Sequence, residues 1–129
     1  MLTGKRKNRG FTLIELLVVL AIIALLAGLA VPVTYMALQK SKESGLKQDL
    51  YIMRKAIDDY YSDNNDYPQN LQDLVTNKYL RNIPVDPITG SSDTWVLVQN
   101  DSQDEQPGIE DIKSGADGKS IDGDDYKDW

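Results

Sequence analysis

The chain has 129 residues, a formal net charge of −6 and neither Cys nor His. This composition excludes disulfide scaffolds, thiol or His-based catalysis and the usual zinc sites. Subtracting the four cations of the first ten residues from −6 leaves −10 for the rest, and an acidic soluble part argues against nucleic acid as a partner. Roughly ninety residues follow the apolar N-terminal stretch, which is enough for one small domain.

The chain begins with a basic leader, residues 1–10, and continues into an apolar stretch, residues 11–33. No charged residue lies between Leu16 and Gln39, and the apolar stretch is long enough to cross a hydrocarbon layer of about 30 Å as one helix. The positive-inside rule places the leader in the cytoplasm and the C-terminal part outside it. Glu15 is the exception, because a carboxylate in a membrane helix is costly unless it has a partner or lies near the interface.

Two simpler interpretations explain this start less well. A cleaved secretory signal has an apolar region of about 7–15 residues, and the apolar stretch here is longer, with no small polar exit after Ala30. A plain membrane anchor explains the length but gives no reason for Glu15 or for the Gly10-Phe11 pair.

The segment Gly10-Phe11-Thr12-Leu13-Ile14-Glu15 behind a basic leader resembles the class III signal of type IV pilins and type II secretion pseudopilins. The resemblance implies that a prepilin peptidase at the inner membrane cleaves after Gly10 and methylates the new amine of Phe11. It also implies a helical filament of copies of this chain. In such a filament, the carboxylate of Glu15 and the Phe11 amine of a neighbour neutralise one another, which fixes the axial register.

One long helix is predicted from Phe11 to about Ser62. Pro32 lies inside it, as it does in the pilin family, and predicts a bend or a local unwinding just before it, because proline lacks a backbone donor. Beyond the membrane part, apolar side chains recur at spacings of four and three residues, which predicts an amphipathic face against a domain core. These residues are Leu46, Leu50, Met53, Ile57 and Tyr60.

The rest of the chain predicts a short helix and two strands. Asn70 is a predicted N-cap for a helix containing Leu71 and Leu74, and Tyr79 and Leu80 are expected to dock on the long helix. Strands are predicted at 94–99 and 109–114 with a polar hairpin loop between them. The expected fold class is therefore α+β, pilin-like, with residues 34–129 as a periplasmic domain that includes the second half of the long helix.

The segment 114–129 combines several aspartates with glycines, which is the composition of an oxygen-ligand loop for Ca²⁺. A solvated acidic loop is the alternative interpretation, whereas disorder is opposed by the aromatic residues at the end of the segment. The segment from Ile109 resembles the C-terminal calcium loop of major pseudopilins. That resemblance implies that Asp117, Asp122 and Asp124 are side-chain ligands. It also implies that the backbone carbonyls of Ser114 and Lys119 complete the coordination shell. The role of Asp125, the next acid along the chain, is less clear.

The leading functional hypothesis is a structural subunit of a periplasmic pseudopilus for type II secretion. Its partners would be other copies of itself, the prepilin peptidase, other pseudopilins, inner-membrane platform proteins and the inner membrane. The alternative is a type IV pilin that forms surface fibres for motility, adhesion or DNA uptake; many such pilins carry a C-terminal Cys pair, which this chain lacks, but short Cys-free pilins exist. Residues 86–95 depart from the usual pseudopilin pattern, which leaves open a related but divergent secretion system. A third hypothesis, a calcium-dependent enzyme, has little support, since no nucleophile–base pair is evident.

Overall fold

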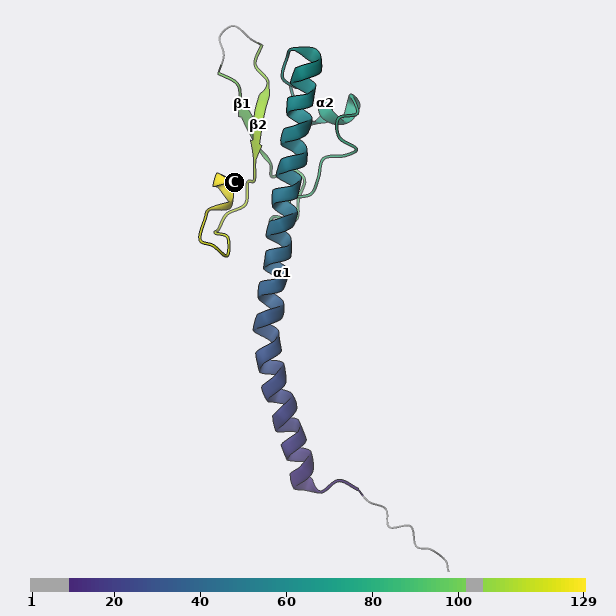
Figure 1. The fold of residues 1–129 in the computed structure, drawn as a ribbon, viewed down its shortest axis with the longest axis vertical. Helices are drawn as coiled ribbons and strands as arrows, with labels where there is room; N and C mark the ends of the chain where they lie inside the picture. Colours follow the sequence, from purple (N-terminus) through teal and green to yellow (C-terminus); the bar gives the residue numbers. More distant parts are fainter. Residues whose placement is uncertain (1–9, 102–105) are drawn as a thin grey trace, which may run out of the picture. The chain divides into compact units, whose positions relative to one another are not determined.

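The structure, a computed structural model, describes residues 10–101 and 106–129. Its elements follow in the order α1 (Leu13–Asn64), α2 (Leu71–Thr76), β1 (Val96–Gln99), β2 (Ile109–Lys113) and the 3₁₀ turn η1 (Tyr126–Asp128) (Figure 1). This arrangement confirms the α+β, pilin-like fold class. The cations of the basic leader and the tip of the predicted hairpin loop lie outside the described residues.

Helix α1 begins and ends two residues later than predicted, and it continues without interruption through Pro32. Local unwinding before Pro32 is therefore absent, and the other form of the prediction, a bend at this place, stays a prediction. Proline removes only its own backbone donor, and the neighbouring turn gains a side-chain bond instead, because the hydroxyl of Thr34 donates to the carbonyl of Ala30 at 3.0 Å.

The chain divides into two compact units, Met1–Ala37 and Leu38–Trp129. The second unit contains the hydrophobic core, and the predicted face of α1 supplies its centre. Leu46, Met53 and Ile57 are fully buried, Leu50 is 2% exposed, and Tyr60 packs against this cluster from the side. The spacing of apolar residues therefore predicted the core correctly.

Helix α2 and its flanks close one side of this core. The backbone N–H of Asp73 donates to the side chain of Asn70 at 2.9 Å, which confirms the predicted N-cap. Leu71 and Leu74 are buried, as is Leu80 just beyond the helix. In Figure 1, α2 and the β-hairpin lie on opposite sides of the C-terminal half of α1.

Strands β1 and β2 form a two-stranded antiparallel sheet with an irregular register. Val98 pairs with Asp111 and Gln99 pairs with Ile109, so Glu110 is an extra residue on β2. Such a bulge shifts the alternation of side chains by one position. It explains why Ile109 and Ile112, three residues apart, are both fully buried in the core.

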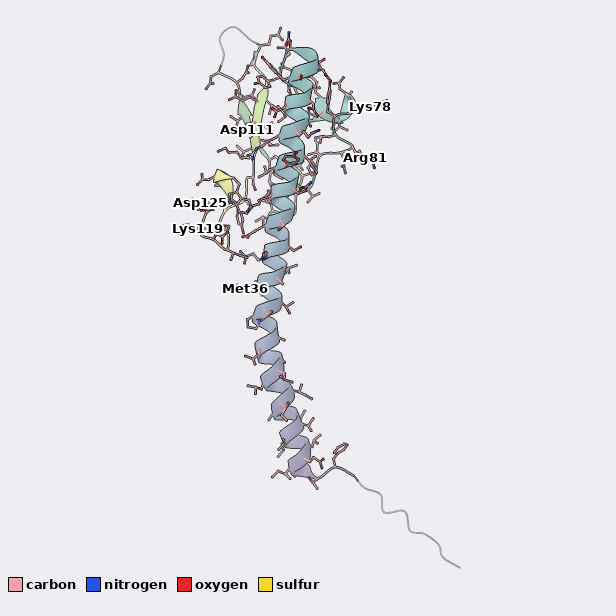
Figure 2. The ribbon with its side chains drawn as sticks, viewed as in Figure 1. Met36, Lys78, Arg81, Asp111, Lys119 and Asp125 are labelled. Atoms are coloured by element: carbon pink, nitrogen blue, oxygen red, sulfur yellow. The ribbon has the colours of Figure 1, made fainter. Side chains whose placement is uncertain are left out.

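The segment after β2 is ordered by contacts at both of its ends. Lys119 and Asp125 form an isolated antiparallel bridge and lie close together in the turn shown in Figure 2. Tyr126 is 4% exposed and stacks edge-on against the ring of Trp129, with the centroids 5.3 Å apart. The prediction that terminal aromatic residues hold this segment in place is confirmed.

Candidate functional site

The predicted cleavage site lies immediately before α1 and is open to an enzyme. Gly10 has no neighbour within 4 Å of the position that a Cβ atom would occupy, and the side chain of Phe11 is 82% exposed. The hydroxyl of Thr12 accepts a hydrogen bond from the backbone N–H of Glu15 at 3.2 Å. Thr12 thus satisfies one of the free donors of the first helical turn.

Glu15 lies in this first turn. Its negative charge there interacts favourably with the positive, N-terminal end of the helix dipole. The sequence had suggested only an assembly role for Glu15. The Thr12-Leu13-Ile14-Glu15 spacing is that of a capping box, and this signal was available from the sequence. A test of Glu15 must therefore separate helix capping from contacts with other molecules.

The first unit presents a continuous apolar surface. Every residue from 10 to 37 is exposed in the single chain, and the large side chains Ile14, Leu25 and Val33 are 71%, 67% and 68% exposed. Within the described residues, one helix, α1, is long and apolar enough to cross a membrane. A large exposed apolar surface is typical of segments that contact lipid or other apolar helices.

We call residues 114–125 the acidic loop. Its turn is fixed by Ser120, whose backbone N–H donates to the carbonyl of Asp124 at 2.7 Å and whose hydroxyl accepts from the N–H of Asp124 at 3.2 Å. Gly118 and Gly123 have φ angles of +106° and +94°, which side chains other than glycine rarely adopt. The structure therefore brings Asp122, Asp124 and Asp125 together on one tight turn.

Asp117 lies on the same loop but has a different neighbour. Its carboxylate binds the Lys127 ammonium at 2.7 Å, and this hydrogen-bonded cation holds the pKa of Asp117 below its ordinary value. Asp117 already stabilises a positive group in this position. Lys127 was not singled out in the sequence, because Asp125 and Asp128 are much nearer to it along the chain than Asp117 is.

The oxygen donors of the acidic loop suit Ca²⁺ in kind. Among the described residues, the carboxylates of Asp122 and Asp124 have no hydrogen-bond or ion-pair partner of their own, so they are free to bind a cation. In the same part of the chain, no group of three or more acidic, His or Cys side chains converges on one point. The chemistry of the donors fits a calcium ion, and the carboxylates would need to move closer together to hold it.

The beginning of the acidic loop is attached to the domain through a buried carboxylate that the sequence analysis missed. Asp86 is fully buried and accepts a hydrogen bond from the hydroxyl of Ser114, as well as from the backbone N–H of Ile88 at 2.8 Å. The Ser114 hydroxyl accepts in turn from the N–H of Ala116 at 3.1 Å. Ser114 is thus held by its side chain, which leaves its predicted role as a carbonyl ligand open.

Helix α1 holds the segment 111–129 through a row of polar side chains. Arg54 donates to the carboxylate of Asp111 at 2.9 Å and to the carbonyls of Ile112 and Trp129 at 3.0 and 2.6 Å. The ammonium of Lys47 lies 4.7 Å from the ring centroid of Trp129, a favourable cation–π distance. These positions looked like solvated charges in the sequence, because their partners are far away along the chain.

Comparison with known proteins gives a family match for the N-terminal segment and relatives that cover nearly the whole chain. Residues 5–31 match the family model described as the prokaryotic N-terminal methylation motif. Type II secretion system core protein G of Klebsiella michiganensis is 32% identical over 97% of this chain and 95% of the relative. The protein of the same name from Escherichia coli is 32% identical over 95% and 92%, and that from Pseudomonas aeruginosa is 37% identical over 64% and 70%. No solved structure was found to match the chain.

The fold and the match to the N-terminal methylation motif together define a pilin-like protein. More particularly, the chain belongs to the type II secretion system core protein G family, and is a pseudopilin of type II secretion. The relatives are named as components of a secretion system and not as enzymes, which confirms the prediction of a structural, non-enzymatic protein. The resemblance seen in Gly10 to Glu15 is likewise confirmed.

Proposed function

We propose that this chain is the repeating subunit of a periplasmic pseudopilus that drives protein export across the outer membrane. The observation that carries the proposal is the uncovered apolar surface of residues 10–37 with a single acid, Glu15, near its start. Before assembly, this segment would span the inner membrane with its N-terminus in the cytoplasm and the domain in the periplasm. After assembly, the same side chains would pack against the helices of neighbouring copies.

Processing would prepare the subunit for this change. A prepilin peptidase would cleave between Gly10 and Phe11 and methylate the amine of Phe11, in keeping with the match to a methylation motif. Cleavage creates a positive charge next to the apolar segment. Pairing of that amine with the Glu15 carboxylate of the next subunit would place two charges together that are each costly in apolar surroundings.

Replacing Glu15 with Leu or Gln tests this assembly mechanism. We expect both variants to remain in the membrane and to be cleaved, but to form few or no fibres and to restore little secretion in cells that lack the native gene. Thr12→Ala is the matched control, because it removes the side-chain cap of α1 and keeps the charge of Glu15. If Glu15→Leu assembles as readily as the parent, the pairing proposal is wrong. If Thr12→Ala lowers assembly as much as Glu15→Leu does, the loss of the helix cap explains the defect, and the pairing proposal is again wrong.

Two further readouts check the processing and the class of fibre. Intact mass of the membrane-extracted protein should show loss of residues 1–10 and gain of one methyl group. Deletion of the gene should abolish protein secretion; loss of surface fibres or motility with secretion intact would instead favour a type IV pilus. Cross-linking in cells should capture copies of this chain, other pseudopilins and inner-membrane platform proteins.

We also propose that the acidic loop binds Ca²⁺ as a structural ion. Support comes from the oxygen donors of Asp117, Asp122 and Asp124, with Asp125 beside them, and from carbonyls such as those of Ser114 and Lys119. The ion would neutralise the repulsion among these acids and add folding energy to a loop with little core of its own.

The melting temperature of the full-length protein in detergent tests the calcium proposal. Calcium at about a hundred times its dissociation constant adds about 2.7 kcal/mol, which corresponds to a rise of roughly 10 °C or more for a domain of this size. Asp124→Ala should abolish the rise, whereas the exposed acid Asp58 of α1 provides a control, Asp58→Ala, that should keep it. Equal melting temperatures in calcium and in EDTA would refute the proposal.

A further inference from the structure

A buried carboxylate on α1 binds the acidic loop at both sides of its aspartate cluster. The side chain of Glu43 is 8% exposed. Its Oε1 atom accepts a hydrogen bond from the backbone N–H of Ile121 at 2.8 Å and from the hydroxyl of Tyr126 at 2.9 Å. Ile121 directly precedes Asp122, and Tyr126 directly follows Asp125.

Burial of the Glu43 carboxylate is unfavourable unless its hydrogen bonds to the loop offset the cost. Burial of a carboxylate costs free energy that only good hydrogen bonds offset, and within the described residues Glu43 has no cationic partner. The acidic loop itself carries four acids against Lys119, so a fifth negative charge beside it adds repulsion. A neutral donor at each end of the turn compensates for part of this cost.

The donors that meet Glu43 are themselves held in place. Burial raises the pKa of the Tyr126 hydroxyl above its ordinary value of 10, and the Glu43 carboxylate adds to this effect. Gln39, one turn earlier on α1, donates to the same hydroxyl oxygen at 3.4 Å. Ser120, just before Ile121, also holds this turn, because its carbonyl accepts a hydrogen bond from the N–H of Gly123 at 3.0 Å.

We infer that Glu43 is the positioning residue of the acidic loop: by binding Ile121 and Tyr126 with one oxygen atom, it sets the spacing of the turn that carries Asp122, Asp124 and Asp125. It touches none of those carboxylates in the described structure and acts on them through the backbone. Fixing the turn in advance reduces the conformational entropy lost when the carboxylates gather around a cation. This last consequence rests on the proposed calcium site, whereas the positioning role does not.

Hydrogen exchange of the full-length protein in detergent and EDTA tests the positioning role without calcium. For Glu43→Ala we expect amides of residues 117–125 to lose protection by about tenfold or more, in line with the loss of hydrogen bonds to a charged group, while amides of β1 and β2 change far less. Glu43→Gln keeps an acceptor oxygen and should retain most of the protection. Asp58→Ala makes the same charge change on the same helix and serves as the control.

Tyr126→Phe provides a milder variant in case Glu43→Ala unfolds the domain. It removes one donor to Glu43 and keeps the ring that packs on Trp129, so the loss of protection should be smaller and again confined to the acidic loop. The inference is overturned if Glu43→Ala affects the loop no more than Asp58→Ala does. It is also overturned if Tyr126→Phe lowers protection equally in the loop and in the β-hairpin.

Calcium titration of the same variants then tests the coupling. If the native chain binds calcium, Glu43→Ala should weaken its affinity by about tenfold or more, and Glu43→Gln should weaken it much less. Unchanged affinity in Glu43→Ala overturns the coupling between Glu43 and the ion. No response of the native chain to calcium refutes the calcium proposal alone, because the exchange experiment in EDTA still decides the role of Glu43.

Discussion

Replacing Asp86 with Ala should destabilise the domain more than replacing any exposed acid of the described structure. Its carboxylate is fully buried and accepts from the hydroxyl of Ser114 and from the backbone N–H groups of Ile88 and Thr89, the last two at 2.8 and 3.4 Å. The alanine variant leaves the Ser114 hydroxyl and the Ile88 N–H without these acceptors in a site that excludes water.

The expected magnitude follows from the number of groups left unpaired. Each buried donor without an acceptor costs about 1–3 kcal/mol, so two of them cost roughly 2–6 kcal/mol. A domain of this size has a free energy of unfolding of about 5–15 kcal/mol. Ser114→Ala removes one donor from a carboxylate that keeps its backbone donors, and should cost only about 1–2 kcal/mol.

Urea unfolding of the full-length protein in detergent measures the effect. Trp95 reports on it, because its ring is buried and its indole N–H donates to the carbonyl of Pro84, two residues before Asp86, at 2.8 Å. Asp93→Ala, an exposed acid in the same loop, is the control and should change the midpoint little. A loss below about 1 kcal/mol for Asp86→Ala would refute the idea that this carboxylate organises the start of the acidic loop.

Three smaller predictions concern stability. Gly115→Ala would place a Cβ atom in steric conflict with the carbonyl oxygen of Thr94, so a thermal melt should show a loss of about 1–3 kcal/mol. Asn70→Ala removes the cap of α2 and should cost about 1 kcal/mol in the same assay. Burial, followed by the nearby charge of Asp86, raises the pKa of Asp49 above 3.8; the folded state therefore holds this proton more tightly, and stability falls as pH rises through that raised value. Asp49→Asn should raise the melting temperature at neutral pH and leave it unchanged at about pH 3, and a lower value at neutral pH would contradict this.

The sequence predicted those parts of the fold that depend on neighbours along the chain. The face of Leu46, Leu50 and Met53 repeats with the helical period, and Asn70 has the side chain and spacing of an N-cap, so both were predictable. Ile109 and Ile112 are three residues apart, a spacing that places them on opposite faces of a regular strand. The bulge that turns both toward the core depends on pairing with the other strand and leaves no clear local signal in the sequence.

The side chains that hold the acidic loop could not be predicted, since their partners are distant in the sequence. Glu43 bonds to a residue 83 positions later and Arg54 to one 75 positions later. Each looks in the sequence like an ordinary charge on a solvated helix face. Asp86 lies between Pro84 and Pro87, a pattern that is typical of a loop and says nothing about burial.

These distant bonds have a consequence for the order of folding. Because Gln39, Glu43 and Arg54 bond to residues between 57 and 87 positions later in the chain, the C-terminal half of α1 completes these bonds only when nearly all of the remaining polypeptide is present. Contacts of such long sequence separation slow folding. Until residue 126 is present, Glu43 lacks one of its two donors and part of the core face of α1 stays uncovered, so the last residues of the chain are needed to complete the fold.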